Sequence, residues 1–311
     1  MNDNIYVQLS RYTQPVLIIF GTIGALLNQI LFHRRKLIKK ASCTVYLRAL
    51  SINDILVLYL IVLTQWLNDQ FHWDPSGTYV WFCKIRTYAM FILYAMSPYY
   101  IVLVCIDRLC RTSKYSSLRE IATPSKAHRI IIITVLMVIL AYSHILFQYN
   151  INRSKCFARN FSYYHVLGYF ILIFYCLLPP LLMSIFSSWT LILLHCYRRK
   201  QEKQYHLKII LPSKNHRCNR NYQLLKILFL YVTTTIICTL PFSILMLLHT
   251  HRFNSNRQLV VYIKTAVLLC NVNHCTSFYI YTLGTPLYRR ELLHLMQSFR
   301  RRFVLWLTHV N

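Results

Sequence analysis

The sequence predicts an all-α integral membrane fold, a seven-transmembrane helix bundle with its N-terminus outside the cell. Two observations support this fold class: the number and length of the apolar segments, and the distribution of basic residues among the loops. Most of the apolar segments approach or exceed the ~20 residues that cross a hydrocarbon core of about 30 Å. These segments are Pro15–Phe32, Tyr46–Leu67, Cys83–Cys105, Ile130–Phe147, Tyr163–His195, Leu224–Leu248 and Leu259–Leu283.

The basic residues orient the bundle. The chain carries 35 Lys and Arg against 8 Asp and Glu, a formal net charge of +27. Such a charge first raises nucleic-acid binding, but a nucleic-acid-binding protein gathers its basic residues on one folded surface. Here 26 of the 35 lie in alternate loops: His33–Arg48, Arg108–Arg129, Arg198–Lys226 and Arg289–Arg302. Loops rich in Lys and Arg stay in the cytoplasm. We therefore expect no nucleic-acid partner, and the basic loops contact anionic membrane lipid, dock a protein partner, or both.

The domain organisation is simple. The polar stretch 1–14 predicts a short extracellular N-terminus without a cleavable signal peptide, because the first apolar segment is long enough to span by itself. The bundle occupies 15–285, and 286–311 form a cytoplasmic end. We expect a single multi-pass domain, 1–311, in the plasma membrane.

The 11 cysteines separate by topology. Nine fall inside the spans or on the reducing side, and only Cys83 and Cys156 lie in outside segments. They are therefore the one pair able to form a lasting disulfide, which would pin the loop after the fourth span over the mouth of the bundle. Asn152 and Asn160 flank Cys156, and each begins a glycosylation sequon.

The third span ends in Cys105-Ile-Asp107-Arg108-Leu109-Cys110, with Arg108 twenty-five positions after Cys83. This resembles the Asp-Arg-Tyr motif of rhodopsin-like (class A) G-protein-coupled receptors, and the resemblance runs from about 15 to 300. The chain looks most like divergent orphan invertebrate receptors of a peptide-type branch. Further matches, in order, are Asn28, Leu50-Ser-Ile-Asn-Asp54, Pro180, Pro241, Asn273, Tyr281 and the start of a short amphipathic eighth helix at Tyr288-Arg-Arg-Glu-Leu292.

The resemblance implies a receptor, not an enzyme, that needs no cofactor. It would bind an extracellular ligand, a neuropeptide or other small ligand, and activate a heterotrimeric G protein by opening the cytoplasmic ends of its helices. Pro180 and Pro241 would kink the fifth and sixth spans. The switch residues would be Asp107, Arg108, Leu109 and Tyr281. Leu109 stands where the family has tyrosine, and Ser277-Phe278 replace its Asn-Pro before Tyr281, so the basal activity stays open.

A buried acid marks the middle of the bundle. A lone charge at the bilayer centre costs roughly 2.5–3.5 kcal/mol, so Asp54 is expected to be functional. In the family a similar polar group binds sodium, here aligned as Asn28, Asp54, Ser97, Asn273, His274 and Ser277. The imidazole of His274 can pair with Asp54 instead, and a third reading is a polar cluster that only joins helices. No other metal is expected.

A ligand pocket is inferred by position. Met90 stands where amine receptors carry an aspartate, and Asn271 where opsins carry the retinal lysine, so neither ligand class is expected. The expected lining is Met90, Tyr94, Phe242, Met246, Lys264 and Asn271. It is aromatic and carries one positive charge, which suits a peptide carboxylate, an amidated peptide or a lipid-like acid. The alternative for each side chain is ordinary helix packing.

A transporter or channel is the competing class. Transporters usually contain two related halves with spans broken by Gly and Pro in corresponding places. The chain shows no such halves and contains only 5 Gly. A membrane hydrolase would need paired acids or a metal motif, neither of which the spacing provides.

Overall fold

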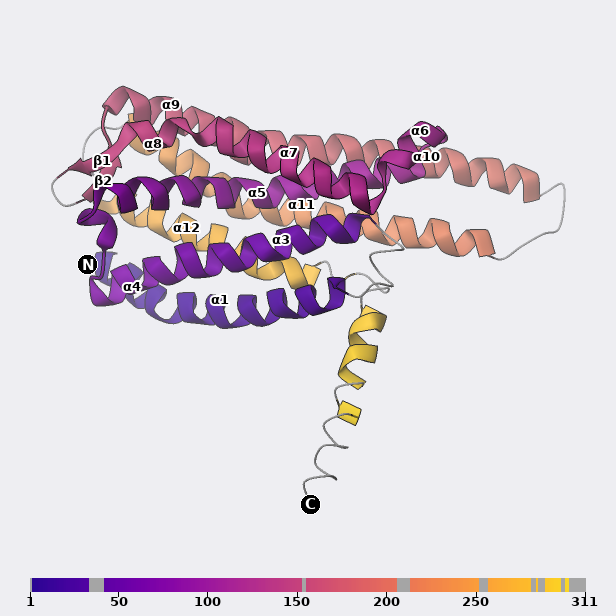
Figure 1. Cartoon of the computed structure of the whole chain (residues 1–311), viewed down its shortest axis with the longest axis horizontal. Coiled ribbons are helices and arrows are strands. Elements are labelled where there is room, and N and C mark those ends of the chain that lie inside the picture. Colours follow the sequence, from indigo (N-terminus) through magenta and orange to yellow (C-terminus); the bar gives the residue numbers. More distant parts are fainter. Residues whose placement is uncertain are drawn as a thin grey trace, which may run out of the picture.

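The structure is a computed structural model that describes residues 2–33, 42–152, 155–205, 213–251, 257–280, 284, 289–297 and 300–301. Its helices run side by side in one bundle (Figure 1). Seven helical stretches of the described chain are long and apolar enough to cross a membrane, which confirms the predicted all-α bundle. They are 6–32, 43–71, 80–112, 124–148, 162–196, 229–249 and 258–278.

Several spans are built from more than one helical element. The long helices are α1 (Asn2–Phe32), α3 (Cys43–Val57), α5 (Val80–Thr112), α7 (Pro124–Tyr142), α10 (Leu178–Tyr205), α11 (Ser213–His251) and α12 (Arg257–Phe278). Shorter elements extend or connect them: η1 (Leu58–Leu63), α4 (Thr64–Phe71), η2 (Pro75–Gly77), α6 (Ser116–Ile121), α8 (His144–Gln148), α9 (Phe161–Ile171) and η3 (Leu172–Leu177). A hairpin of β1 (Tyr149–Asn152) and β2 (Lys155–Ala158) follows α8.

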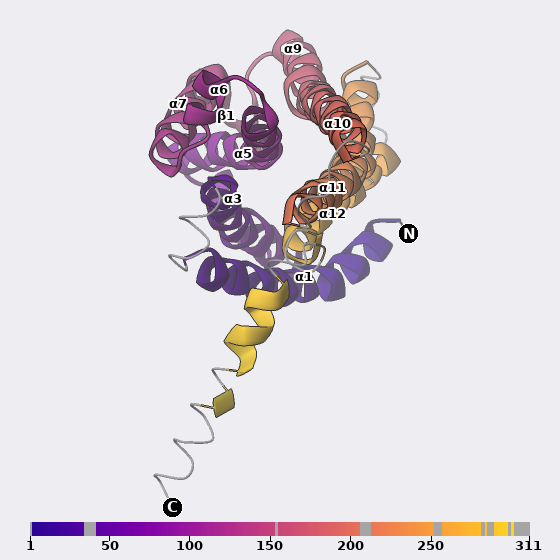
Figure 2. The same ribbon diagram turned by 90° about the vertical axis from the view of Figure 1, so that its right-hand side faces the viewer.

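The helices form a ring when viewed along the bundle (Figure 2). Helix α5 packs against α3, α7 and α10, while α1 closes the ring between α3 and α12. The hairpin and the start of α1 lie at one end of the bundle, here called the hairpin end, and α6 lies at the opposite end, the α6 end (Figure 1).

The first helix begins earlier than its apolar segment. Helix α1 starts at Asn2 and contains Pro15, so the polar stretch before Pro15 continues the first span as helix. Part of its polar surface faces α4: Tyr6 is 2% exposed, and its hydroxyl donates to Asp69 at 2.8 Å. The apolar pattern does not predict this part of α1, because 1–14 is polar and its contact with α4 is made through side-chain hydrogen bonds such as that of Tyr6.

Apolar side chains cover the outside of the bundle. On α7 they recur every three or four residues, as expected for one face of a helix. A patch of this size on a soluble protein would be an aggregation hazard, and on a spanning helix it is the surface that contacts lipid. The side chains of α7 that are more than half exposed are Ile132, Ile133, Leu136, Met137 and Leu140.

Two glycines allow α1 to approach its neighbours closely. A Cβ at Gly24 would lie 2.9 Å from Cβ of Phe278, and one at Gly21 would lie 2.7 Å from the Leu58 side chain. Small residues permit this backbone approach between membrane helices. Phe278, which stands where the resemblance has a proline, is 5% exposed and packs against the space that Gly24 leaves.

Prolines at or next to the predicted kink positions remove N–H donors from the helical ladder, and the kinks at Pro180 and Pro241 themselves stay predictions. Within η3 the Leu178 amide bonds to the Ile173 carbonyl, so the next partner in that pattern is Pro179, which has no N–H. The Phe174 carbonyl instead accepts from the Tyr99 hydroxyl of α5 at 2.9 Å. In α11, which contains Pro241, the Cys238 carbonyl accepts from the Cys270 thiol of α12 at 3.4 Å. Neighbouring helices thus supply donors close to both interruptions.

Residues 289–297 are helical, at the place of the predicted eighth helix. Its position along a membrane surface stays a prediction, and Tyr281 and Tyr288 lie outside the described residues. For the basic stretch Arg198–Lys226 the structure gives helix bounds but describes few side chains.

Candidate functional site

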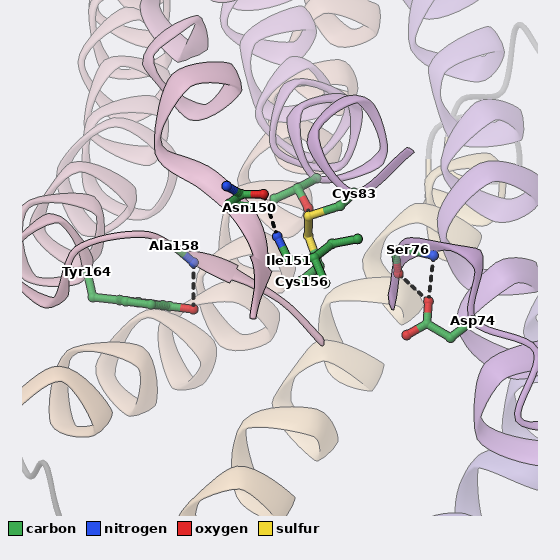
Figure 3. Close-up of a disulfide and its surroundings, with 9 residues drawn as sticks. Asp74, Ser76, Cys83, Asn150, Ile151, Cys156, Ala158 and Tyr164 are labelled. Atoms are coloured by element: carbon green, nitrogen blue, oxygen red, sulfur yellow. Dashed lines mark hydrogen bonds between the residues drawn. A yellow bond between two sulfur atoms is a disulfide. The ribbon is translucent and has the colours of Figure 1, made fainter. Parts of the chain in front are cut away.

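The predicted disulfide between Cys83 and Cys156 is present at the hairpin end (Figure 3). The two Cα atoms lie 5.6 Å apart, across 73 residues of sequence. Cys156 lies in β2, where it pairs with Ile151 of β1, and Cys83 lies in the first turn of α5. The bridge therefore fixes the hairpin to α5, as the sequence predicted.

Local hydrogen bonds order the segments around the bridge. The Asp74 carboxylate accepts from the Ser76 amide at 3.0 Å and from the Ser76 hydroxyl, which caps η2 (Figure 3). At the base of the hairpin, burial and the neighbouring Tyr164 raise the pKa of the Tyr149 phenol well above its ordinary value, so this group is neutral. Asn152 and Asn160 are both exposed, which glycosylation requires, and their modification stays a prediction.

Asp54 lies in the last turn of α3, near the middle of the span 43–71, and is 1% exposed. Its Oδ1 lies 3.3 Å from the Ser97 hydroxyl of α5 and 3.0 Å from Nδ1 of His274 of α12. Its Oδ2 accepts from the Ser277 hydroxyl at 2.6 Å. Four of the six predicted polar residues are thus in direct contact, and they join α3, α5 and α12.

The geometry at Asp54 favours the histidine pair over sodium. Hard cations take oxygen ligands, whereas an imidazole nitrogen lies on the carboxylate oxygen Oδ1. Nδ1 also lies 3.2 Å from the Ser97 hydroxyl, and His274 Nε2 is buried without a hydrogen-bond partner. The residues present therefore fit an Asp54–His274 pair better than a sodium site.

The two remaining polar residues occupy other contacts. Asn273 is 2% exposed, and its Oδ1 accepts from the Thr235 hydroxyl of α11 at 3.5 Å. Asn28 is 4% exposed in α1. Asn273 therefore ties α12 to α11, next to the Asp54 cluster.

Two of the predicted ligand-pocket residues meet directly. The Tyr94 hydroxyl of α5 donates to Asn271 Oδ1 of α12 at 2.7 Å. The Tyr94 ring lies 5.3 Å from the His274 ring and 6.5 Å from that of Tyr175. Asn271 Nδ2 is buried without a hydrogen-bond partner. Three further residues of the predicted pocket are partly buried and pack against the core: Met90, Phe242 and Met246.

Lys264 belongs to a polar cluster that the sequence did not reveal. Its Nζ lies 3.9 Å from Asp69 Oδ1 and 5.0 Å from the centre of the Tyr6 ring, while Tyr6 donates to Asp69. In a separate contact, Arg86 Nη2 of α5 donates to the hydroxyl of Thr64, in the first turn of α4, at 3.1 Å. Asp69 and Arg86 are charges within spans, and this is the signal in the sequence that could have found them, as it did Asp54.

Asp107 and Arg108 lie near the α6 end of α5. Asp107 is 4% exposed, accepts from the Ser42 hydroxyl, and has Arg111 Nε 3.2 Å from its Oδ2. Arg111 also lies within hydrogen-bond distance of the Ala122 carbonyl, beyond α6. Arg108 Nη2 donates to Cys43 Sγ at 2.9 Å. The sequence selected Asp107 and Arg108 but not these partners. Leu109 is partly buried, and Tyr281 lies outside the described residues.

The comparisons with known proteins agree with this arrangement. The family model described as 7 transmembrane receptor (rhodopsin family) matches residues 25–281. The chain is also similar to the C-C chemokine receptor type 1 of Macaca fascicularis. The two are 24% identical over 320 residues, an alignment that covers 99% of this chain and 85% of that receptor. The matched region contains the disulfide, the Asp54 cluster and the Asp107–Arg108 pair.

Proposed function

This chain belongs to the rhodopsin family of seven-transmembrane receptors, and on that premise we propose that it binds an extracellular ligand at the hairpin end and activates a heterotrimeric G protein at the α6 end. The N-terminus then lies outside the cell, and the basic loops face the cytoplasm, in keeping with their charge. The receptor spans the plasma membrane and carries out no chemical reaction itself.

The observation that carries this proposal is a continuous set of contacts from the hairpin half to the middle of the bundle. Tyr94 contacts both Asn271 and His274, and His274 contacts Asp54. A ligand that displaces Tyr94 therefore also disturbs the Asp54–His274 contacts that hold α3, α5 and α12 together. Agonism requires only that the ligand bind the rearranged bundle better than the resting one, since this difference in affinity sets the shift in population.

The proposed ligand is a peptide or small protein with an accessible carboxylate. Among the similar proteins is a receptor named for C-C chemokines. Arg86 lies one helical turn from Met90 and two from Tyr94 on α5, and its guanidinium reaches the Thr64 hydroxyl. A guanidinium binds a carboxylate through two parallel hydrogen bonds, so Arg86 would give the predicted pocket a second cationic anchor in addition to Lys264.

Agonist-stimulated nucleotide exchange tests the receptor function. Purified receptor in lipid nanodiscs, mixed with each class of G-protein heterotrimer, is screened with peptide and small-protein libraries. We expect ligand-dependent exchange that is lost in Arg108→Ala and retained in the control Met137→Ala, which truncates an exposed apolar side chain of α7. Absence of exchange with every heterotrimer, together with solute or ion flux through receptor-containing liposomes, would support a channel or transporter instead.

The ligand chemistry has its own test. Arg86→Gln is expected to weaken an agonist with a free carboxylate about tenfold to a hundredfold, about 1.4–2.8 kcal/mol. The amide of the same agonist should bind wild type more weakly than the acid does. Its affinity for the Arg86→Gln variant should be no lower than its affinity for wild type. Lys84→Gln, two residues earlier on α5, is the charge-matched control. Equal losses for the acid and the amide would exclude Arg86 as the carboxylate anchor.

A further inference from the structure

A group of unpaired cations lies at the α6 end, around the start of the fourth span. All four are exposed: Lys114, Arg119, Lys126 and Arg129. Within the part of the chain that the structure describes, none of the four belongs to an ion pair. The sequence places a single acid, Glu120, between 114 and 129. This surface therefore has a positive charge that the protein itself does not neutralise.

Two of these cations lie on the lipid-facing side of α7. Residues three, four and seven positions apart share one face of a helix. Lys126 and Arg129 are thus in line with Ile133, which is 59% exposed, and Arg129 is in line with Leu136, which is 53% exposed. Long basic side chains at the end of an apolar stripe place their charges among the lipid headgroups. Lys126 and Arg129 therefore continue the lipid-contacting surface of α7 into the headgroup layer.

The other two cations flank exposed apolar side chains. Lys114 precedes α6, and Arg119 lies within it. The apolar side chains of this segment are Tyr115, Leu118 and Ile121, which are 73%, 39% and 39% exposed. The Thr123 amide bonds to the Ile121 carbonyl at 2.8 Å, so the turn between the helices holds α6 beside the start of α7 (Figure 2). Basic and apolar residues in one surface segment suit the boundary between headgroups and acyl chains.

We propose that α6 and the start of α7 form a binding site for a polyphosphoinositide, a lipid of the cytoplasmic leaflet whose headgroup carries several phosphates. Clusters of at least about four Lys and Arg directly inside a span attract such lipids. Phosphatidylserine has one net negative charge and would leave most of this cluster unneutralised, whereas several phosphates match it. Arg119 and Arg129 can each bind a phosphate through two parallel hydrogen bonds. The inference rests on the proposed function for its orientation, with the α6 end in the cytoplasm.

Binding of a short-chain fluorescent phosphatidylinositol bisphosphate to the purified receptor in neutral detergent micelles tests the site. Lys126→Gln combined with Arg129→Gln should weaken binding about tenfold. The thermal unfolding temperature should stay unchanged, because both side chains are exposed. The charge-matched control is Arg11→Gln combined with Lys155→Gln, two exposed cations of the hairpin end, and it should bind like wild type. Equal weakening by the two pairs would reveal general attraction to a basic protein and overturn the inference.

Competition against the same probe identifies the part of the lipid that is bound. Unlabelled phosphatidylinositol bisphosphate should displace the probe about tenfold more effectively than phosphatidylserine, which has fewer negative charges. It should also exceed inositol trisphosphate about tenfold, because that molecule has the phosphates but no acyl chains to contact α7. Equal displacement by phosphatidylserine would contradict recognition of several phosphates, and equal displacement by inositol trisphosphate would indicate a site for free phosphate instead.

Docking of a G protein on the same cations is the competing explanation. Nucleotide exchange without ligand in nanodiscs of phosphatidylcholine alone separates the two. Loss of this exchange in the Lys126→Gln and Arg129→Gln variant, with lipid binding unchanged, would assign the cations to the G protein and overturn the lipid site. Lipid binding that depends on these cations, in a receptor that supports no exchange with any heterotrimer, would reject the receptor function and leave the lipid site supported.

Discussion

Two buried aspartates of this bundle are stabilised in different ways. Asp54, 1% exposed, contacts Ser97, His274 and Ser277 from two other helices. Asp107, 4% exposed, contacts Arg111 one turn further along its own helix and Ser42 at the start of α3. The first acid thus holds three helices together in mid-span, whereas the second is anchored mainly within α5.

This difference implies that the two acids respond differently when helices move apart. The Asp54 contacts must break or rearrange together if α3, α5 and α12 move apart, and no water is available in the hydrocarbon layer to replace them. Arg111 is permanently charged and 31% exposed, so the Asp107 ion pair persists when the helix ends separate. The middle of the bundle therefore resists separation, and the α6 end permits it.

The largest expected effect is on folding. Asp54→Ala should lower the free energy of unfolding by about 3–5 kcal/mol, because it leaves the imidazole of His274 and the Ser277 hydroxyl buried without their acceptor. Asp107→Ala should cost much less, about 1 kcal/mol, because Arg111 can turn to water. Thermal unfolding in the same detergent, with Asp74→Ala as a loop control, measures both. Equal losses at the two positions would remove the contrast between them.

A second test replaces the partner of Asp54. Wild type should unfold at the same temperature in sodium chloride and choline chloride, because His274 occupies Asp54 Oδ1. His274→Ser should gain sodium-dependent stability, about 1.4 kcal/mol when sodium is at ten times its dissociation constant. The gain should disappear when Asp54→Asn is added. Sodium stabilisation of wild type that is unchanged in His274→Ser would contradict the Asp54–His274 pair.

The sequence was sufficient for the features that depend on composition and order. Seven spans follow from the apolar segments, and Cys83 with Cys156 follows from the side of the membrane on which each lies. Sequence order also placed Asp54, Ser97, His274 and Ser277 in one cluster, because those positions align with a family whose bundle is similar.

Helix rotation decided what the sequence did not reveal. Ser42 and Cys43 contact Asp107 and Arg108 because of the way in which α3 packs against α5. Tyr6 reaches Asp69 only because α1 continues as helix before Pro15. The Asp107–Arg111 pair is an exception, since four residues along a helix is the spacing of a direct neighbour. That pair could have been predicted from the sequence.

The smallest expected effect compares one hydroxyl at each acid. Ser277→Ala removes a hydrogen bond of 2.6 Å to Asp54 in a layer without water, and should lower the free energy of unfolding by about 1.5 kcal/mol. Ser42→Ala removes the hydroxyl that bonds Asp107, where Arg111 remains, and should cost only about 0.5 kcal/mol. Denaturant titration of both variants with Ser188→Ala, a lipid-side serine of α10, as control separates these values. A loss at Ser42 as large as that at Ser277 would mean that Asp107 is as dependent on its neighbours as Asp54, and that the α6 end is as rigid as the middle of the bundle.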